Sequence, residues 1–294
     1  MKQISLKRFK KILIKFFIDL LLFLSFKLVK ILLNFIGFNN TSLLGGYLFK
    51  KIGPVTKYHQ IIKSNMKVIY KDEEKIKSFA IRNLEQTGKT FFEFINLNKF
   101  NKNKLTVIND EYLKEIINIK KSYLFVSAHY GNWEITRNFL LDYGFKLHSV
   151  YRQANNKLIN NEIQKIRKKP GAYFYKKGKE SAKHMIKALK NNECLAILVD
   201  QKDNSGSKIN FFNNPANTNT GFAALALKYQ TTICPIRSKR ITNDNFEIII
   251  DKPILYNEFK NKTEVELTQQ IYSEHIEKWI IEDPSQWLWA HKRW

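Results

Sequence analysis

The chain has 294 residues, enough for one large domain with its own core. Hydrophobic residues make up 44% of it, which excludes a disordered protein. Lys and Arg number 50 against 26 Asp and Glu, which gives a net charge of +24. This charge favours an anionic partner, such as acidic lipid, a phosphorylated substrate or an acidic carrier protein. No zinc-finger spacing or nucleic-acid motif supports a nucleic-acid partner.

The most hydrophobic stretch covers residues 11–38. It is too long for the core of a signal peptide, and no small-residue cleavage site follows it. At about 100° per residue, its polar residues fall on one side of a helix and its apolar residues crowd the other. The polar residues are Lys15, Asp19, Lys27, Lys30 and Asn34, and the apolar ones are Leu13, Phe17, Leu20, Leu24, Leu28 and Ile31. The spacing of Lys15 and Asp19 predicts an ion pair.

Residues 1–40 are therefore predicted to form a membrane anchor helix, and residues 41–294 a single domain. The length of the helix allows it to span a bilayer, which takes roughly 20 apolar residues. A charge at the bilayer centre costs at least ~2.5 kcal/mol, which favours a helix lying in the membrane plane. An ordinary core helix is the remaining alternative. Basic residues before the apolar stretch would keep that end on the cytoplasmic side; they are Lys2, Lys7, Arg8, Lys10 and Lys11.

After the anchor, the pattern of residues 56–118 predicts helices, with Asp72 as an N-cap. The helical periodicity then ends, and residues 123–129 form a short apolar run that is typical of a buried strand. Residues 132–144 predict a helix that stops at Gly144.

A regular alternation follows. We expect strands at 146–152, 172–176 and 194–200, helices at 155–169 and 179–192, and then a helix at 220–230, a strand at 231–238 and a helix at 246–254. This order predicts an α/β domain with a central, mostly parallel sheet flanked by helices. Cys194 and Cys234 lie in separate apolar runs and are predicted to be buried free thiols, as in a reducing compartment.

The segment SAHYGNWE, residues 127–134, is the most informative for chemistry. Its strand delivers His129 at the carboxyl end, the edge of an α/β sheet where active sites lie. Gly131 permits a sharp turn, which can bring Glu134 from the next helix back to the imidazole. A carboxylate on one imidazole nitrogen makes the other a better base for an attacking hydroxyl. His129 and Glu134 are therefore predicted to catalyse acyl transfer from a thioester to an alcohol, without a metal.

Several motifs resemble, in the same order, those of the bacterial lipid A biosynthesis acyltransferases. HYGNWE resembles the His-x-Gly-Asn-Trp-Glu block of that family, and SVYRQANN its Tyr-Arg-Pro-x-Asn-Asn segment, with Gln153 in place of the usual Pro. LVDQ resembles the Asp-Gln block. FFNNPANT resembles Phe-Phe-Gly-x-Pro-Ala-x-Thr, with Asn213 in place of Gly, and PSQWLWAHKRW resembles the closing block. The resemblance runs from the anchor to the last residue.

The resemblance implies a glycerolphosphate-acyltransferase-like fold and a cofactor-free enzyme of lipopolysaccharide biosynthesis, bound to the inner membrane with its catalytic domain facing the cytoplasm. Its donor would be an acyl carrier protein thioester. Its acceptor would be a hydroxyl of a phosphorylated glucosamine disaccharide lipid, the lipid A precursor. His129 and Glu134 would be catalytic. The substrate-binding residues implied are Arg152, Arg167, Asp200 and Gln201.

The residues alone leave other interpretations open. Arg152 and Arg167 also fit a solvated basic face, and Asp200 also fits a turn cap. Lys292 and Arg293 suit phosphate headgroups, and the tail tryptophans suit the core or a membrane interface; these are Trp287, Trp289 and Trp294. The same chemistry would serve another glycolipid or a glycerophospholipid, with acyl-CoA as donor. A basic membrane-surface binding protein is the non-enzymatic alternative, which the intact HYGNWE block disfavours.

Overall fold

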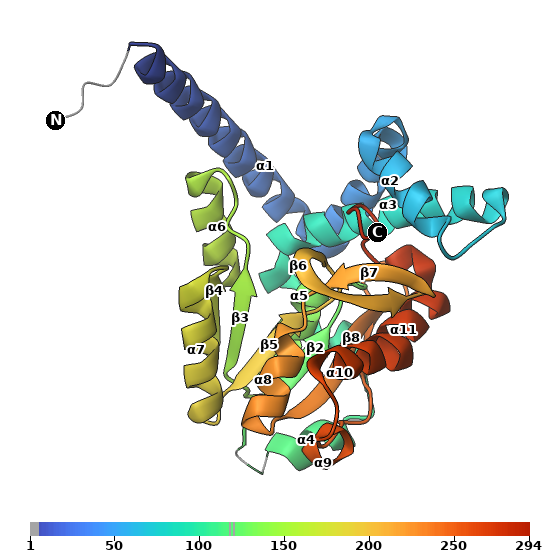
Figure 1. Ribbon diagram of the computed structural model, residues 1–294. Helices are drawn as coiled ribbons and strands as arrows, with labels where there is room; N and C mark the ends of the chain where they lie inside the picture. The colour runs from blue at the N-terminus through green and yellow to red at the C-terminus, as the bar shows by residue number, and fades with distance from the viewer. Residues whose placement is uncertain (1–5, 118, 120) are drawn as a thin grey trace.

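A computed structural model of the protein describes residues 6–117, 119 and 121–294 (Figure 1). Its centre is a seven-stranded sheet in the order β1-β9-β8-β2-β5-β3-β4. The strands are β1 (Leu105–Ile108), β2 (Tyr123–Ser127), β3 (Leu147–Tyr151), β4 (Ala172–Lys176), β5 (Cys194–Leu198), β8 (Thr232–Arg240) and β9 (Phe246–Ile250). Within the described ranges, β8 and β9 are the one antiparallel pair of this sheet. The predicted α/β class with a mostly parallel sheet is confirmed.

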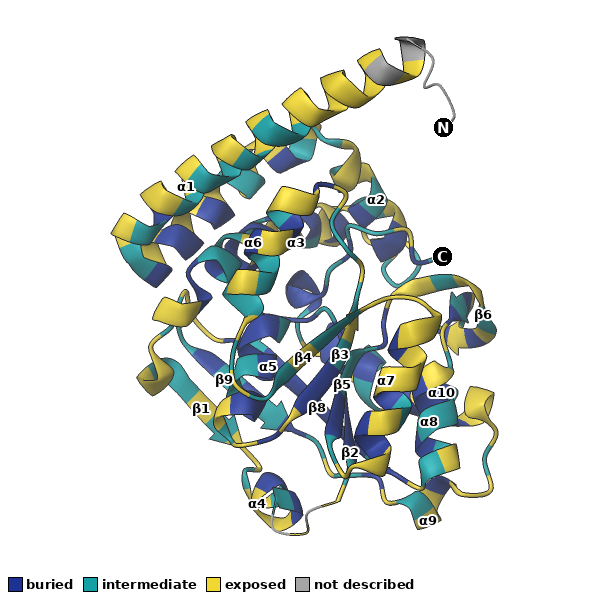
Figure 2. Ribbon diagram, turned by 90° about the vertical axis from the view of Figure 1, so that its left-hand side faces the viewer, coloured by how far each residue is buried: buried dark blue, intermediate teal, exposed yellow. Residues whose placement is uncertain are grey.

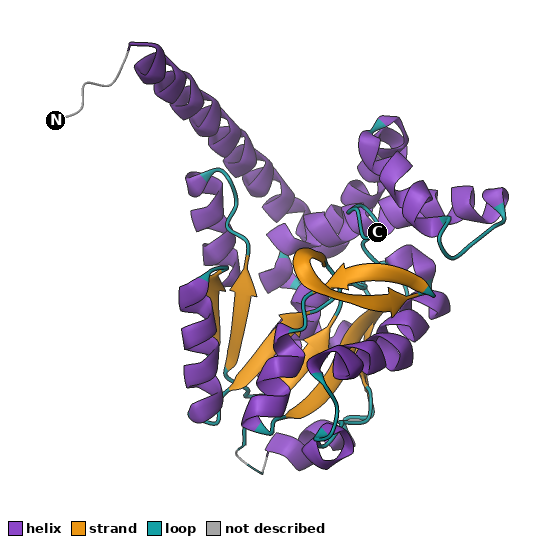
Figure 3. Cartoon of the chain, in the orientation of Figure 1, coloured by secondary structure: helices purple, strands orange, loops and turns teal. Residues whose placement is uncertain are grey.

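Helices cover the sheet (Figure 3), and a separate hairpin of β6 (Lys202–Phe211) and β7 (Asn214–Thr218) lies beside it. The helices are α1 (Leu6–Ile52), α2 (Lys57–Met66), α3 (Glu73–Ile95), α4 (Glu111–Ile117), α5 (Trp133–Asp142), α6 (Lys157–Arg167), α7 (Lys179–Lys190), α8 (Gly221–Tyr229), α9 (Tyr256–Phe259), α10 (Glu264–Ile271) and α11 (Glu277–Glu282). The predicted helix cap is confirmed, because Asp72 accepts hydrogen bonds from the first turn of α3.

The sheet separates two apolar cores. Phe125 of β2 belongs to one core together with Leu140 of α5. Its neighbour Val126 belongs to the other, together with Ala223 of α8 and Trp279 of α11. Because alternate side chains of β2 enter different cores, the strand reads as an uninterrupted apolar run. That burial is what made it recognisable in the sequence.

Two expectations about the edge of the sheet differ from the structure. Residues 246–254 were predicted to be helical, but residues 246–250 form β9, whose side chains alternate between buried and half-buried. Its isoleucines are β-branched and suit a strand that pairs with β8. The helical stretch predicted to residue 118, which lies outside the described residues, also contains the short strand β1, parallel to β9.

Helix α1 bends at Gly37, where φ is 76° and ψ is 176°. Beyond the bend it packs closely along α3: a Cβ on Gly45 would lie 2.5 Å from the carbonyl oxygen of Gly88. The predicted anchor boundary at residue 40 therefore falls inside α1, and the last part of the helix belongs to the folded body.

Before the bend, the polar side of α1 faces the domain. Lys15 and Asp19 form the predicted ion pair, at 2.7 Å. Lys27 and Lys30 lie 3.3 and 3.1 Å from a carboxylate oxygen of Glu162 in α6. Lys165, together with Lys30 and Lys27, holds the pKa of Glu162 at about 2.

The opposite, apolar side of α1 is exposed (Figure 2). Its exposed residues include Leu13, Phe17, Leu24, Leu28 and Ile31. Such a row of uncovered apolar side chains is unusual on a protein surface and marks an interaction site. Within the described ranges, no helix combines the length and the apolar character that a membrane span requires. Of the basic residues expected at the start of the helix, Lys2 lies outside the described residues.

Candidate active site

His129 and Asp200 lie side by side at the carboxyl ends of two neighbouring strands. His129 follows β2 and Asp200 follows β5, and these strands are parallel with Ser127 opposite Leu198. The Nδ1 atom of His129 is 2.8 Å from Oδ1 of Asp200. The backbone N–H of His129 donates to Oδ2 at 2.9 Å. Parallel pairing thus brings an imidazole and a carboxylate to the edge of the sheet where active sites lie.

Asp200 is fully buried and accepts a third hydrogen bond, from the indole N–H of Trp287 at 2.7 Å. Burial by itself disfavours the charged carboxylate, but the charge and hydrogen bonds of His129 outweigh it and hold the pKa of Asp200 below its ordinary value. Because an ionised carboxylate only accepts, Nδ1 of His129 carries the proton. The Nε2 atom is left as the basic nitrogen, 3.4 Å from the amide nitrogen of Gln201.

Glu134 was predicted to bind the imidazole, but the structure places Asp200 at that nitrogen. In the first turn of α5, Glu134 instead accepts a hydrogen bond from Nε of Arg167 at 3.0 Å. Its other oxygen lies 3.0 Å from Nη1 of Arg137. Burial opposes its ionisation, yet the two arginines, with a smaller contribution from His129, hold the pKa of Glu134 below its ordinary value. Among the described residues, Glu134 pairs with these two arginines and makes no hydrogen bond with His129.

Arg137 and Arg167 lie over the same aromatic ring, with their guanidinium carbons 5.0 and 5.4 Å from the centroid of Phe174. Together they exceed the charge of Glu134 by one unit. Arg137 is buried, and its Nε has no hydrogen-bond partner among the described residues. Arg137 was not among the predicted site residues, although its position three residues after Glu134 on one helix face was a usable signal.

A cavity of about 810 Å³ opens beside His129. All the predicted site residues except Asp200 line it, and Asp200 lies buried behind His129. Arg152 follows β3 and is exposed there. Much of the remaining lining is apolar and includes Phe125, Leu140, Met185, Ile197, Leu198 and Phe222. The cavity thus joins a polar, cationic region containing His129 to an apolar interior.

The turn that carries His129 into α5 admits only glycine at residue 131. Gly131 has φ +56°, and a Cβ there would lie 2.0 Å from the carbonyl oxygen of Ser238. The next residue, Asn132, donates its backbone N–H to Oγ of Ser238 at 2.9 Å. Its side chain accepts from the backbone N–H groups of Glu134 and Ile135, capping α5.

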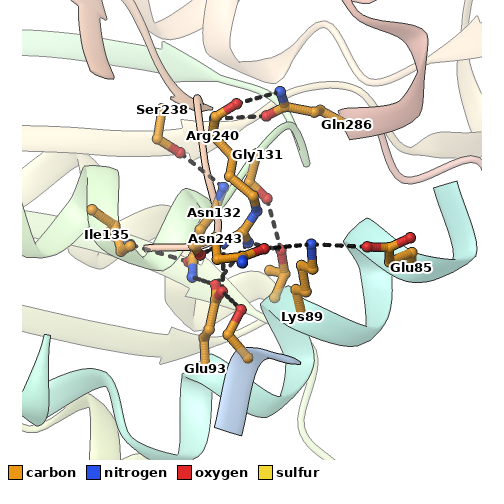
Figure 4. A network of polar contacts seen from close by, with 12 residues as sticks. Glu85, Lys89, Glu93, Gly131, Asn132, Ile135, Ser238, Arg240, Asn243 and Gln286 are labelled. Atoms are coloured by element: carbon orange, nitrogen blue, oxygen red, sulfur yellow. Dashed lines mark hydrogen bonds and ion pairs between the residues drawn. The ribbon is translucent and has the colours of Figure 1, made fainter. Parts of the chain in front are cut away.

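A buried ion pair lies beneath this turn (Figure 4). Arg240 of β8 donates two hydrogen bonds to Glu93 of α3, from Nη1 to Oε1 at 2.5 Å and from Nη2 to Oε2 at 2.8 Å. Glu93 also accepts hydrogen bonds from Asn132 at 2.7 Å and from Ser42 of α1 at 2.5 Å. The network ties α1, α3 and the sheet to the turn that follows His129, and so fixes its position.

The C-terminal segment supports the same turn. Leu288 donates its backbone N–H to the carbonyl oxygen of His129 at 2.9 Å, and Gly131 donates to the carbonyl oxygen of Gln286 at 3.0 Å. Trp287 and Trp289 are fully buried, which confirms their predicted core packing. The sequence did not reveal that this segment contacts Asp200 and the backbone of His129.

Arg293 and the two cysteines are also buried. Arg293 donates to the hydroxyl of Thr218 at 2.6 Å and to the carbonyl oxygen of Asn217 at 3.0 Å. The predicted contact of Arg293 with headgroups is therefore wrong, because the guanidinium is enclosed. Cys194 and Cys234 are buried free thiols, as expected, and burial raises the pKa of Cys194 to about 11.

Comparison with known proteins identifies the family. A family model described as bacterial lipid A biosynthesis acyltransferase matches residues 12–294. Among solved structures, the chain is similar to the 1-acyl-sn-glycerophosphate (LPA) acyltransferase PlsC from Thermotoga maritima, with 13% identity and a TM-score of 0.39 over 82% of this chain and 96% of that one. No curated protein matches. Since the family model spans nearly the whole chain, the protein is an acyltransferase and belongs to the bacterial lipid A biosynthesis acyltransferase family.

Proposed function

We propose that the enzyme transfers a fatty acyl group from acyl carrier protein to a hydroxyl of a phosphorylated lipid A precursor. The supporting observation is the basic Nε2 of His129 at a cavity that is apolar inside and lined by arginines near the histidine. An acyl chain fits the apolar part, and a phosphorylated acceptor or an acidic carrier fits the cationic part. An acyl-CoA donor and a glycerophospholipid or other glycolipid acceptor form the second candidate.

In this mechanism His129 is the general base. Its Nε2 takes the proton of the acceptor hydroxyl as that oxygen attacks the thioester carbonyl carbon. The carbon–sulfur bond then breaks, and the imidazolium returns the proton to the departing thiolate. Asp200 holds the ring by its hydrogen bond at Nδ1 and stabilises the imidazolium. The amide of Gln201, whose nitrogen lies 3.4 Å from Nε2 of His129, is the donor that we assign to the developing oxyanion.

The arginines of the cavity bind the anionic groups of the substrates. Glu134 holds Arg137 and Arg167 in fixed positions, which prepares them for a phosphate without further ordering. Arg152 is exposed at the cavity and adds a third cation. We assign the acceptor phosphates or the phosphopantetheine of the donor to these three residues.

Cells with and without the protein should differ in their lipid A. With the protein, mass spectrometry should show lipid A heavier by one acyl group, attached as an ester to an existing hydroxyacyl chain. Purified enzyme should make the same product from acyl carrier protein thioester and the precursor. An unchanged lipid A, together with a newly acylated glycerophospholipid made from acyl-CoA, would instead establish the second candidate.

We further propose that α1 attaches the enzyme to the cytoplasmic face of the inner membrane, lying in the membrane plane. The support is that its charged side is engaged by Glu162, whereas its apolar side is uncovered. The net charge of +24 of the whole chain also favours binding to a membrane that contains anionic lipid.

Replacing Phe17, Leu24 and Leu28 together by Ser should release the protein from anionic liposomes. All three are more than half exposed, so the fold keeps its contacts. Each side chain contributes about 2 kcal/mol when buried in lipid, so the partition coefficient should fall on the order of ten-thousandfold. Cosedimentation with liposomes measures it. Ile281→Ser and Leu255→Ser change exposed apolar residues elsewhere and should have no effect. Equal sedimentation of the triple variant and the wild type would disprove the attachment.

A further inference from the structure

The chain ends beside helix α3 (Figure 1), in a segment whose hydrogen bonds alternate between two neighbours. We call residues 285–291 the tail. Gln286 and Leu288 of the tail bond to the turn that carries His129. The alternate residues of the tail present their carbonyl oxygens to α2 and α3; they are Ser285, Trp287, Trp289 and His291. The tail therefore lies between the active-site turn and the helices that follow α1.

Two buried asparagines bind these four carbonyl groups. Asn83 of α3 donates from its side-chain amide to the carbonyl oxygens of Ser285 at 2.8 Å and of Trp287 at 2.6 Å. Asn65 of α2 donates in the same way to the other two carbonyl oxygens, at 2.8 and 2.6 Å. A primary amide carries two N–H donors, so one side chain can hold two carbonyl groups that are two residues apart. Each asparagine thus supplies the donors that a neighbouring strand would otherwise provide.

Packing alone does not account for Asn83. The residue is 1% exposed, and its Oδ1 atom has no hydrogen-bond partner among the described residues. A buried acceptor that stays unsatisfied costs free energy. The nearby residues Ala80 and Leu84 of the same helix belong to the apolar core, which an apolar side chain at position 83 would extend. The hydrogen bonds to the tail are what an asparagine adds at this position.

Trp287 connects Asn83 to the catalytic pair. Its carbonyl oxygen is held by Asn83, and its indole N–H donates to Oδ2 of Asp200 at 2.7 Å. The indole also packs edge-on against the rings of Trp289 and Phe211, with centroids 4.6 and 5.6 Å away. Because these rings leave the indole little room to turn, a displacement of the Trp287 backbone displaces its N–H as well.

We propose that Asn83 is a positioning residue of the active site: it fixes Trp287 so that the indole N–H holds the carboxylate of Asp200 in line with His129. The proposal rests on the proposed role of His129 as the general base. A hydrogen bond to a carboxylate depends strongly on distance and angle, so a shifted indole weakens the hold on Asp200 even in a folded protein. Asn65 binds farther along the tail, at residues that donate no hydrogen bond to Asp200 within the described ranges.

Asn83→Ala should lower kcat about tenfold and leave KM nearly unchanged, because Asn83 does not line the cavity. Trp287→Phe removes the indole N–H and should lower kcat by about tenfold to a hundredfold, the usual effect of losing a hydrogen bond to a charged group. The double variant should be little worse than Trp287→Phe, since Asn83 acts through that N–H.

Asn65→Ala is the matched control. It removes the same number of hydrogen bonds from a buried asparagine of the neighbouring helix and should lower the stability in urea by a similar amount. It should nevertheless keep most of its turnover, and its effect should add to that of Trp287→Phe. Asn83→Ser keeps one donor and serves if Asn83→Ala does not fold; it should reduce kcat by a smaller factor.

A spectroscopic measurement needs no substrate. The indole ¹H–¹⁵N signal of Trp287, assigned by its loss in Trp287→Phe, should move upfield in the Asn83 variants and stay in place in Asn65→Ala. An unmoved signal in folded Asn83 variants, or equal losses of kcat in Asn83→Ala and Asn65→Ala, would overturn the assignment of Asn83. A signal that moves as expected, in a protein whose kcat does not change in Trp287→Phe, would instead overturn the proposed part of Asp200 and His129 in the reaction.

Discussion

His129→Ala should lower kcat by about 10²–10⁴-fold, the usual contribution of a positioned general base. Asp200→Asn should cost a comparable factor. It keeps the size of the side chain but removes the charge that holds the proton on Nδ1 of His129. The double variant should be little worse than His129→Ala, because the two residues act as a unit. Steady-state kinetics with an acyl thioester and the lipid acceptor measure all three.

Two controls separate this mechanism from its rivals. His184→Ala removes an exposed histidine outside the cavity lining and should leave kcat unchanged. Glu134→Gln keeps the imidazole bonded to Asp200 but weakens the hold on Arg137 and Arg167, so KM should rise. If Glu134→Gln abolished turnover while Asp200→Asn had no effect, Glu134 would be the partner of His129 after all. Near-normal turnover by His129→Ala, or an accumulated acyl-enzyme, would refute general-base catalysis.

Glu93→Ala should lower the free energy of unfolding by about 3–5 kcal/mol, because it leaves the buried guanidinium of Arg240 without its counterion. Asn132 and Ser42 would lose their acceptor as well. Urea unfolding followed by circular dichroism measures the change. Activity should also fall at temperatures where the protein remains folded, because Asn132 helps to set the turn after His129.

The matched control is Glu180→Ala, which breaks an ion pair with Lys183 whose two side chains are exposed. Such surface pairs contribute about 0–1 kcal/mol. Adding Arg240→Met to Glu93→Ala should restore part of the lost stability, since the unpaired charge is then gone. A loss below 1 kcal/mol in Glu93→Ala would show that the pair does not hold the turn.

The sequence predicted His129 correctly as a strand-end residue, because a short apolar run followed by Gly131 is a local signal. The hydrogen-bond partner of His129 could not be predicted from the local sequence. Glu134 and Asp200 were both recognised as site residues, but which of them reaches Nδ1 depends on β5 lying next to β2, and the order of strands is not written in either segment.

Other differences have the same origin. The stretch at 246–254 is too short for periodicity to separate a strand from a helix, and its pairing with β8 decided the outcome. The two-sided character of α1 was visible in the sequence. That its charged side would face inward depended on Glu162, a residue far along the chain.

The contacts of residues 286–288 with the active-site turn impose an order on biosynthesis. His129 and Asp200 emerge from the ribosome well before Trp287, whose indole holds Asp200, and before Leu288, which holds the backbone of His129. A nascent chain that already displays α1 and the central strands therefore has both reacting groups but not the segment that fixes them. We therefore expect acyl transfer to begin only when that late segment has docked, and a chain that lacks it to consume no donor thioester.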